Sequence, residues 1–251
     1  MPFPRTAVAP YTSRMNELVH SIAARKTASP SVAKNPRSRA AKAAPASRTN
    51  DPARTMAGIL EVATAEFASK GLSGARIDEI AAATRTSKRM IYYYFGSKEG
   101  LYVAVLEESY RRMRAIEAEL HLEDLAPEAA LRRLVKFTFD HHQGNPDYIR
   151  LVMTENMERG VYLAQSKSIR ELNVPAIEAI RKLYNRGVAD GIFRPGLDPI
   201  DIHASISALT FFNVSNQHTF GLIFKKDTQT AKALTARRDS IIEMVVRFVR
   251  N

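Results

Sequence analysis

Residues 86–98 read TSKRMIYYYFGSK, a short helical pattern that combines cations with consecutive tyrosines. Ser87 is a favourable N-cap residue, and Ile91 and Phe95 stand four residues apart, so they share one face that can turn inward. A second capped start follows at Ser97. The side chains that we expect to point outward are Lys88, Arg89, Tyr92 and Tyr93.

This outward face has the chemistry of a DNA-contacting surface. Lysine and arginine pair with backbone phosphates, and tyrosine hydroxyls form hydrogen bonds with phosphates and with groove edges. A solvated basic face would carry the same residue types, so the segments upstream have to decide between the two interpretations.

Two further helices are predicted upstream. Apolar residues recur at helical spacing over 53–70, and Gly71 follows at a C-cap position. Residues 77–83 form a short second helix with acids in its first turn, where they favour the helix dipole. A turn over 84–86 then leads to Ser87. Two short helices braced by a longer one indicate a helix-turn-helix, whose second helix enters the major groove of DNA.

Spaced positions across residues 53–101 combine into one pattern: Ile59, Leu60, Ala63, Phe67, Gly71, Ile80, Ala81, Ser87, Tyr92, Phe95, Gly96, Ser97, Lys98, Glu99 and Leu101. Together they resemble the N-terminal domain of the TetR family of bacterial transcriptional regulators. The resemblance implies that Tyr92 contacts DNA, that Lys98 contacts a phosphate, and that Lys88 and Arg89 reach base edges.

Three places depart from the family pattern. Ala75 and Arg76 replace the usual Ser or Thr before the second helix, which therefore lacks a cap oxygen, and Arg76 becomes a phosphate-contact candidate. Arg85 and Thr86 replace the turn glycine and valine, which leaves the turn geometry open. Gly100 replaces the glutamate of a capping box. The predicted DNA-binding residues are Arg76, Ser87, Lys88, Arg89, Tyr92, Tyr93, Tyr94 and Lys98.

Composition favours a polyanionic partner and excludes several other classes. The chain has 251 residues, a net charge of +11 and no cysteine, so disulfides and thiolate metal sites are excluded. No apolar run approaches the ~18–20 residues of a membrane span, so we expect a soluble protein without a membrane partner. We expect it in the bacterial cytoplasm, associated with the nucleoid.

The excess charge is concentrated near the N-terminus. Residues 1–52 hold nine lysines and arginines against two acids, a net charge of +7. Residues 27–47 consist mainly of Ala, Ser, Pro, Lys and Arg, which cannot bury enough surface to fold alone. We predict a flexible basic arm over 1–52, which either follows DNA or is a non-specific tail. A helix-turn-helix domain over 53–100 and an effector-binding and dimerisation domain over 101–251 would follow it.

Helical periodicity continues almost to the end of the chain, so the predicted fold class is all-α, with a C-terminal helical bundle. The expected helices cover 97–120, 127–143, 146–159, 161–171, 173–190, 198–223 and 229–250. The last two carry apolar stripes that could equally be internal core. Because the family usually dimerises through such a pair, the resemblance implies a homodimer interface of Ile202, Ile206, Leu209, Ile241, Ile242, Val245, Val246 and Val249.

Polar and aromatic residues on otherwise apolar helices are the candidates for an effector pocket, because ligand cavities are mostly apolar with a few orienting polar groups. Adjacent histidines diverge by about 100° on a helix, so His141 and His142 cannot easily share one metal. The predicted pocket residues are His141, His142, Asn156, Tyr162, Phe212, Asn213 and Gln217, with Tyr148, Phe211 and His218 as further candidates.

Taken with the resemblance, these patterns predict a regulator that binds a roughly palindromic operator on double-stranded DNA as a dimer and is released by a small-molecule effector. An activator, or a regulator without a ligand, has the same sequence features. The main alternatives are a non-specific architectural DNA-binding protein and a helical enzyme. Neither a nucleotide-binding loop nor a His-Glu-x-x-His helix is present, so we expect no enzyme activity, no cofactor and no metal.

Overall fold

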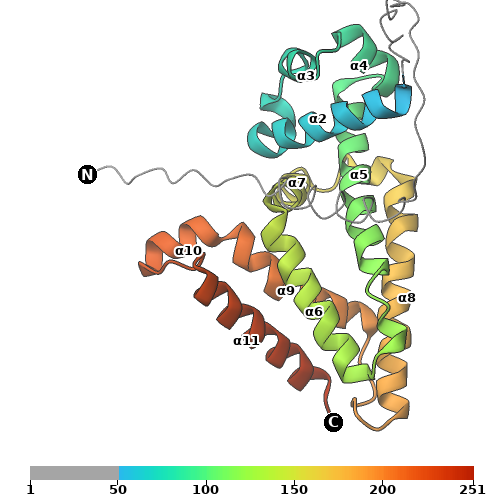
Figure 1. Ribbon diagram of the computed structural model, residues 1–251, viewed down its shortest axis with the longest axis vertical. Coiled ribbons are helices and arrows are strands. Elements are labelled where there is room, and N and C mark those ends of the chain that lie inside the picture. Colours follow the sequence, from blue (N-terminus) through green and yellow to red (C-terminus); the bar gives the residue numbers. More distant parts are fainter. Residues whose placement is uncertain (1–50) are drawn as a thin grey trace, which may run out of the picture. The chain divides into compact units, whose positions relative to one another are not determined.

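The computed structural model describes residues 51–251, which fold into helices joined by short turns (Figure 1). Except for its last two residues, the arm predicted for 1–52 lies outside this range. The helices are α2 Pro52–Gly74, α3 Ile77–Ala83, α4 Lys88–Phe95, α5 Lys98–Ala118, α6 Pro127–Gly144, α7 Pro146–Met157, α8 Lys167–Ala189, α9 Pro199–Ser215, α10 Gln217–Phe224 and α11 Ala231–Val249, with single 3-10 turns at Leu122–Asp124 and Leu163–Gln165.

Side-chain caps fix several helix starts. The Asp51 carboxylate accepts hydrogen bonds from the backbone N–H groups of Ala53 and Arg54, so α2 begins at Pro52, inside the predicted arm. Ser87 caps α4 and Ser97 caps α5, as predicted, each by accepting a hydrogen bond from the N–H three residues on. These caps place α4 between two sharply defined turns.

Two helix divisions differ from the prediction. In place of the two helices expected over 161–171 and 173–190 there is one continuous α-helix, α8, which begins at Lys167 and has Pro175 inside it. Proline removes one backbone hydrogen bond there, but apolar residues on both sides are buried, with Ile169 packed among α2 to α5 and Ile180 among α6, α9 and α11. Conversely, the helix expected over 198–223 ends at Ser215, because Asn216 leaves helical geometry, and α10 follows.

Two apolar clusters hold the fold together. The first, which we call the head core, joins α2, α3, α4 and the first half of α5, and it also takes in Leu151 of α7 and Ile169 of α8. The second, the bundle core, joins α6, α8, α9 and α11. Helix α5 therefore begins in the head core and runs on toward the bundle (Figure 1).

The stripes predicted to form a dimer interface face inward instead. Six of these residues are buried in the bundle core of their own chain, and Leu209 and Ile242 are partly buried against it. A side chain buried within its own chain cannot meet a second chain, so these six residues are not direct interface contacts, while Leu209 and Ile242 stay a prediction. A stripe marks the face of a helix that packs, whether the neighbouring helix belongs to the same chain or to another. The six buried residues are Ile202, Ile206, Ile241, Val245, Val246 and Val249.

Across residues 51–251, none of the helices combines the length and apolarity needed to cross a lipid bilayer.

Candidate nucleic-acid interface and effector cavity

Helix α4 is anchored by a single buried side chain. Ile91 is fully buried in the head core, as the spacing predicted, and Phe95 is half-buried against that core. On the opposite side Tyr92 and Tyr93 are 43% and 77% exposed. The short helix therefore keeps Tyr92 and Tyr93 exposed on the side away from the head core.

Tyr94 does not belong to this free face. It is half-buried, its ring packs against the head core, and its centroid lies 6.2 Å from that of Phe95. The helical rotation of about 100° per residue carries Tyr94 away from Tyr92 and toward the buried side of α4. The ring therefore has a packing role, and a DNA contact by the Tyr94 hydroxyl stays a prediction.

Two cations of the predicted interface, Arg76 and Lys88, lie near the same carboxylate. Lys88 forms an ion pair with Asp78 of α3, and Arg76 lies 4.0 Å from the same carboxylate. All three side chains are about half exposed or more, and exposed pairs of this kind contribute little to stability. A DNA phosphate can therefore replace Asp78 as the partner of either cation at small cost.

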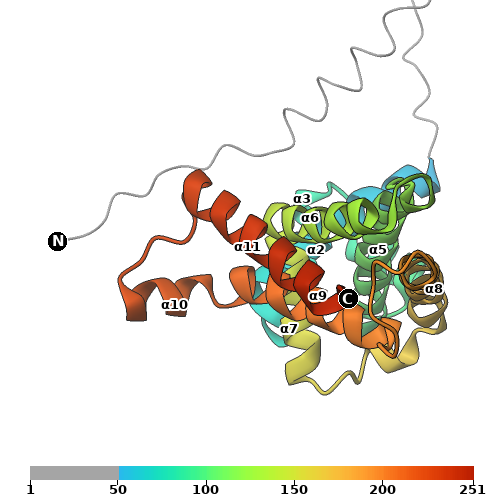
Figure 2. The same cartoon turned by 90° about the horizontal axis from the view of Figure 1, so that it is seen from below.

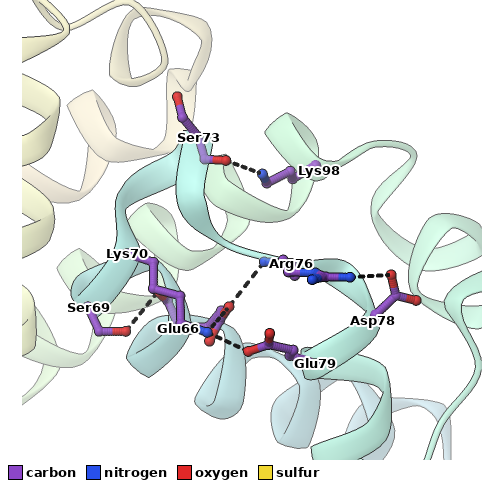
Figure 3. Close-up of polar contacts among 8 residues, drawn as sticks. All are labelled: Glu66, Ser69, Lys70, Ser73, Arg76, Asp78, Glu79 and Lys98. Atoms are coloured by element: carbon purple, nitrogen blue, oxygen red, sulfur yellow. Dashed lines mark hydrogen bonds and ion pairs between the residues drawn. The ribbon is translucent and has the colours of Figure 1, made fainter.

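A polar network joins α3 to the long helix α2 (Figure 3). The Glu66 carboxylate of α2 accepts a hydrogen bond from the backbone N–H of Arg76 at 3.0 Å. Lys70 bridges Glu66 and Glu79, so the pKa of Lys70 is raised, chiefly by its hydrogen bond to Glu79, and the pKa of Glu79 is lowered by the same contact. Glu66 thus satisfies the start of α3, which has no side-chain cap of its own.

Lys98 stands at the first position of α5, close to the end of α2. Its Nζ donates a hydrogen bond to the carbonyl oxygen of Ser73 at 3.3 Å (Figure 3). A lysine at a helix C-terminus interacts favourably with the free carbonyls there. The ammonium group is therefore held at the edge of the head rather than extended into solvent.

A cavity of about 780 Å³ lies among α5, α6, α7, α8 and α9. Of the predicted pocket residues, His142 alone is among its lining residues; it is buried, and its Nδ1 atom has no hydrogen-bond partner among the described residues. Tyr148 and Phe211, which the sequence also suggested, line the cavity too. His141 points elsewhere, with its ring against Phe137 and Tyr148.

The other predicted pocket residues lie away from this cavity. Asn156 is exposed on α7, where its amide bonds the carbonyl of its own preceding turn. Tyr162 packs its ring edge-on against Tyr102 in the head core. Phe212, Asn213 and Gln217 line a separate hollow of about 540 Å³ between α9–α10 and α11. The structure therefore does not gather the predicted pocket residues at one site, because they lie on several helices whose mutual packing the sequence did not specify.

Among the lining residues that the sequence analysis did not name are Tyr110, Arg114, Asn173 and His203. A usable signal existed for Arg114. It stands four residues after Tyr110 and eight after the buried Leu106, so of the three arginines in this stretch it alone continues the inward face of α5. Asn173 and His203 carried no such signal, because their neighbours are only partly apolar.

Burial governs the protonation of the histidines around the cavity. Desolvation lowers the pKa of His142 to about 4, with further lowering by the neighbouring His141, Arg114 and His203. The pKa of His141 also falls to about 4, and that of His203 is lowered, in both cases chiefly by burial. These imidazoles are therefore neutral at pH 7 and can act as hydrogen-bond donors or acceptors.

Comparison with known proteins identifies the fold and the family. The family model described as "Bacterial regulatory proteins, tetR family" matches residues 59–105, and "Tetracyclin repressor-like, C-terminal domain" matches residues 127–245. The HTH-type transcriptional repressor NicS of Pseudomonas putida is 34% identical over 197 residues, which are 78% of this chain and 93% of that protein. The chain belongs to the TetR family.

Other TetR-family relatives agree. The repressor SCO4008 of Streptomyces coelicolor is 38% identical over 149 residues, 59% of this chain and 74% of that one. The crystal structure of the putative regulator SCO4942 from the same organism has a TM-score of 0.58 and 29% identity, covering 78% of this chain and 98% of that chain. A tetR-family structure from Rhodococcus RHA1, at 20% identity and a TM-score of 0.63 over 78% and 97%, shares the fold.

Membership of the TetR family makes the chain a helix-turn-helix transcriptional regulator, with α3 and α4 as the two short helices. The structure also accounts for two of the departures from the family pattern, at Arg85 and at Gly100. Arg85 adopts a left-handed backbone conformation with φ +52°, the geometry for which the usual turn glycine is suited. The turn is therefore preserved at a conformational cost.

A steric constraint explains why glycine rather than glutamate stands at position 100. A Cβ atom at this position would lie 2.1 Å from the carbonyl oxygen of Phe95, well inside van der Waals contact. Glutamate therefore cannot stand here without shifting the link between α4 and α5. Only the Ser97 half of a capping box is formed.

Proposed function

We propose that the protein represses transcription as a homodimer on a roughly palindromic operator and that a small molecule in the α5–α9 cavity releases it. The observation that carries this proposal is the course of α5. Its first half packs in the head core through Leu101, Tyr102 and Val105, and its second half supplies Tyr110 and Arg114 to the cavity. One rigid element therefore connects the DNA-reading head to the candidate effector site.

For DNA binding, α4 would lie in the major groove with its free face toward the bases. Tyr92, Tyr93, Lys88 and Arg89 are exposed and grouped on this face, while Ser87 stands at the helix N-terminus, where backbone N–H groups favour a phosphate. Arg76, Arg85 and Lys98 would contact the flanking phosphates. These roles support a division of labour in which residues 53–100 read DNA and residues 101–251 respond to ligand and dimerise.

For dimerisation, the exposed apolar side chains of the C-terminal helices replace the buried stripes as candidates. None of the eight residues of α10 is buried, and Leu222, Ile223 and Phe224 are 81%, 71% and 62% exposed. Figures 1 and 2 both show α10 at the edge of the bundle, following α9. Exposed apolar groups in contact with one another are the usual mark of a protein interface. We call these three residues the apolar arm and propose that it packs on a second copy of the chain.

For ligand release, the effector must bind the DNA-incompetent arrangement more tightly than the DNA-bound one. A shift of the second half of α5 around a ligand would move its first half, which carries Lys98 and the packing of α4. The names of NicS and SCO4008 as repressors favour repression over activation for this chain. Its place of action would be chromosomal DNA in the bacterial cytoplasm.

The test is fluorescence anisotropy with the purified full-length chain and labelled DNA from upstream of its own gene and neighbouring genes. A scrambled duplex of the same composition is the control, and both are titrated over a range of salt concentrations. We expect two chains per site and affinity on the order of 10³-fold higher for the native sequence. Equal affinity for every fragment, with steep salt dependence, would replace the proposal by the architectural alternative.

A further inference from the structure

One charged side chain in the cavity is held in a fixed orientation with one edge free. Arg114 is only 10% exposed and lines the cavity. Its Nε donates a hydrogen bond to the Asn173 amide oxygen at 3.0 Å, and its Nη1 forms an ion pair with Glu117, which is 11% exposed. Among the described residues, Nη2 has no hydrogen-bond partner. Glu117 and Asn173 thus position a guanidinium whose remaining edge is open to a ligand.

The neighbours of Arg114 suit a flat, unsaturated molecule. Tyr110 and Tyr148 pack edge to face with centroids 5.6 Å apart, and His142 lies 6.2 Å from Tyr148 and 6.1 Å from Phe211. All four aromatic side chains line the cavity together with aliphatic residues of α8. Such walls favour stacked or edge-on contacts with another ring.

The polar groups of the cavity favour negative charge. Arg114, Arg170 and Arg181 line it against one acid, Glu178, which pairs with Arg181 at 3.2 Å. Arg114 contributes to lowering the pKa of each of the three histidines, whereas Glu117, its ion-pair partner, raises that of His203. A cationic ligand would be repelled there, whereas an anion would gain a charge-assisted hydrogen bond from a preoriented donor.

We propose that the effector is an aromatic monocarboxylate, with its carboxylate on the free edge of Arg114, its ring against the aromatic side chains of Tyr148 and Phe211, and the His142 Nδ1–H group donating a hydrogen bond to it. The buried Nδ1 of His142 has no partner in the chain, and leaving such an atom unsatisfied is costly unless a ligand or water bonds it. This inference rests on the proposed function only in taking the cavity as the effector site.

The first experiment uses the full-length protein without DNA and two matched pairs of probes, benzoate with benzamide and 2-naphthoate with 2-naphthamide. Each pair keeps the ring and removes the charge. Isothermal titration calorimetry and thermal unfolding should show binding by at least one acid, with its amide tenfold weaker or more. Equal binding of acid and amide, or no binding of either acid at millimolar concentration, overturns the proposal.

Variants of α5 locate the carboxylate. Arg114→Gln should reduce the affinity for the acid to that of its amide, and the double variant Arg114→Gln, Glu117→Gln gives the same test without leaving a buried charge unpaired. The matched control is Arg112→Gln, which removes an exposed arginine that pairs with Glu108 at 2.6 Å outside the cavity. It should bind the acid like the wild type. Unchanged acid binding in a folded Arg114 variant overturns the proposal.

Failure of this inference and failure of the proposed function are distinguishable. Binding of the acid to the free protein is measured without DNA, whereas release is measured by adding the acid to the protein–operator complex. Acid binding without release would contradict the ligand-released repressor and leave the inference standing. Release by amides or other neutral compounds as readily as by acids would contradict the inference and leave the ligand-released repressor standing.

Discussion

Helices α4 and α10 have the same length, eight residues, and present opposite surfaces. Helix α4 buries Ile91 in the head core and presents cations and tyrosines, whereas α10 buries none of its residues and presents the apolar arm. A short helix has little stability of its own and depends on what it packs against. The chemistry left exposed therefore indicates the partner: phosphates and base edges for α4, and apolar protein surface for α10.

The largest expected effect tests whether α4 depends on one anchor. Ile91→Ala should lower the free energy of unfolding by about 3 kcal/mol, because the buried side chain leaves a cavity. The same truncation in α10, Ile223→Ala, should destabilise in a manner that depends on protein concentration, since its packing would come from a second chain. Urea unfolding at two protein concentrations measures both. A concentration-independent loss at Ile223 would contradict the comparison.

The apolar arm can be broken directly. Leu222→Asp with Ile223→Asp should weaken the dimer by about 100-fold, because two charges would be buried in an apolar contact. Analytical ultracentrifugation reports the dissociation constant. The control is Thr219→Asp on the same helix, which adds a charge at an exposed polar site. A dimer that survives the double variant unchanged would place the interface elsewhere.

Acid should destabilise the bundle rather than α4, because α2 to α5 contain no histidine. The pKa of His142 is about 4 in the folded chain and about 6.5 unfolded, so the unfolded state binds more protons between these values. The contribution of neutral His142 to the free energy of unfolding is therefore fully present above pH 6.5. It is lost as the pH falls toward 4, and the loss is on the order of 2 kcal/mol.

Unfolding titrations at pH 7.5 and 5 measure this loss. His142→Gln should reduce the difference between the two pH values, whereas His218→Gln on the exposed side of α10 should not. An unchanged pH dependence in His142→Gln would show that the buried imidazole is not its source.

The free face of α4 is tested at Tyr92. Tyr92→Ala should weaken operator binding about tenfold without lowering the melting temperature, since the ring is exposed and one good contact contributes ~1–3 kcal/mol. Tyr94→Phe keeps the packed ring and should leave operator affinity unchanged. Anisotropy on the native operator distinguishes the two. Equal losses of operator affinity in the two variants would show that the Tyr94 hydroxyl also contacts DNA.

The smallest effect concerns the turn before α4. Arg85→Gly should stabilise the fold by less than about 1 kcal/mol. Glycine removes the strain of the left-handed backbone conformation, but it also makes the unfolded chain more flexible, which offsets part of that gain. If Arg85 also contacts a phosphate, the salt dependence of operator binding should become shallower by about one ion. Thermal unfolding and a salt series measure the two effects separately.

Local chemistry made much of the head predictable. Ser87 as a cap and Ile91 as the inward residue follow from rules that act within one turn of helix, and the structure confirms both. Gly71 leaves helical geometry with φ +66°, as its predicted C-cap position requires, but α2 continues beyond it to Gly74. The same reasoning missed that Glu66 satisfies the start of α3, because ten residues separate the acid from the Arg76 backbone.

The bundle was less predictable for the same physical reason. Its stripes at Ile241 and Val245 were visible in the sequence, but the helix that covers them was not, since apolar burial is non-directional and does not name its partner. Arg114, Asn173 and His142 lie on three different helices and meet only through packing. The sequence alone therefore determined most of the helices, several of their caps and the exposed face of α4. Tertiary packing decided which apolar faces are internal, which remain exposed, and which polar groups share the cavity.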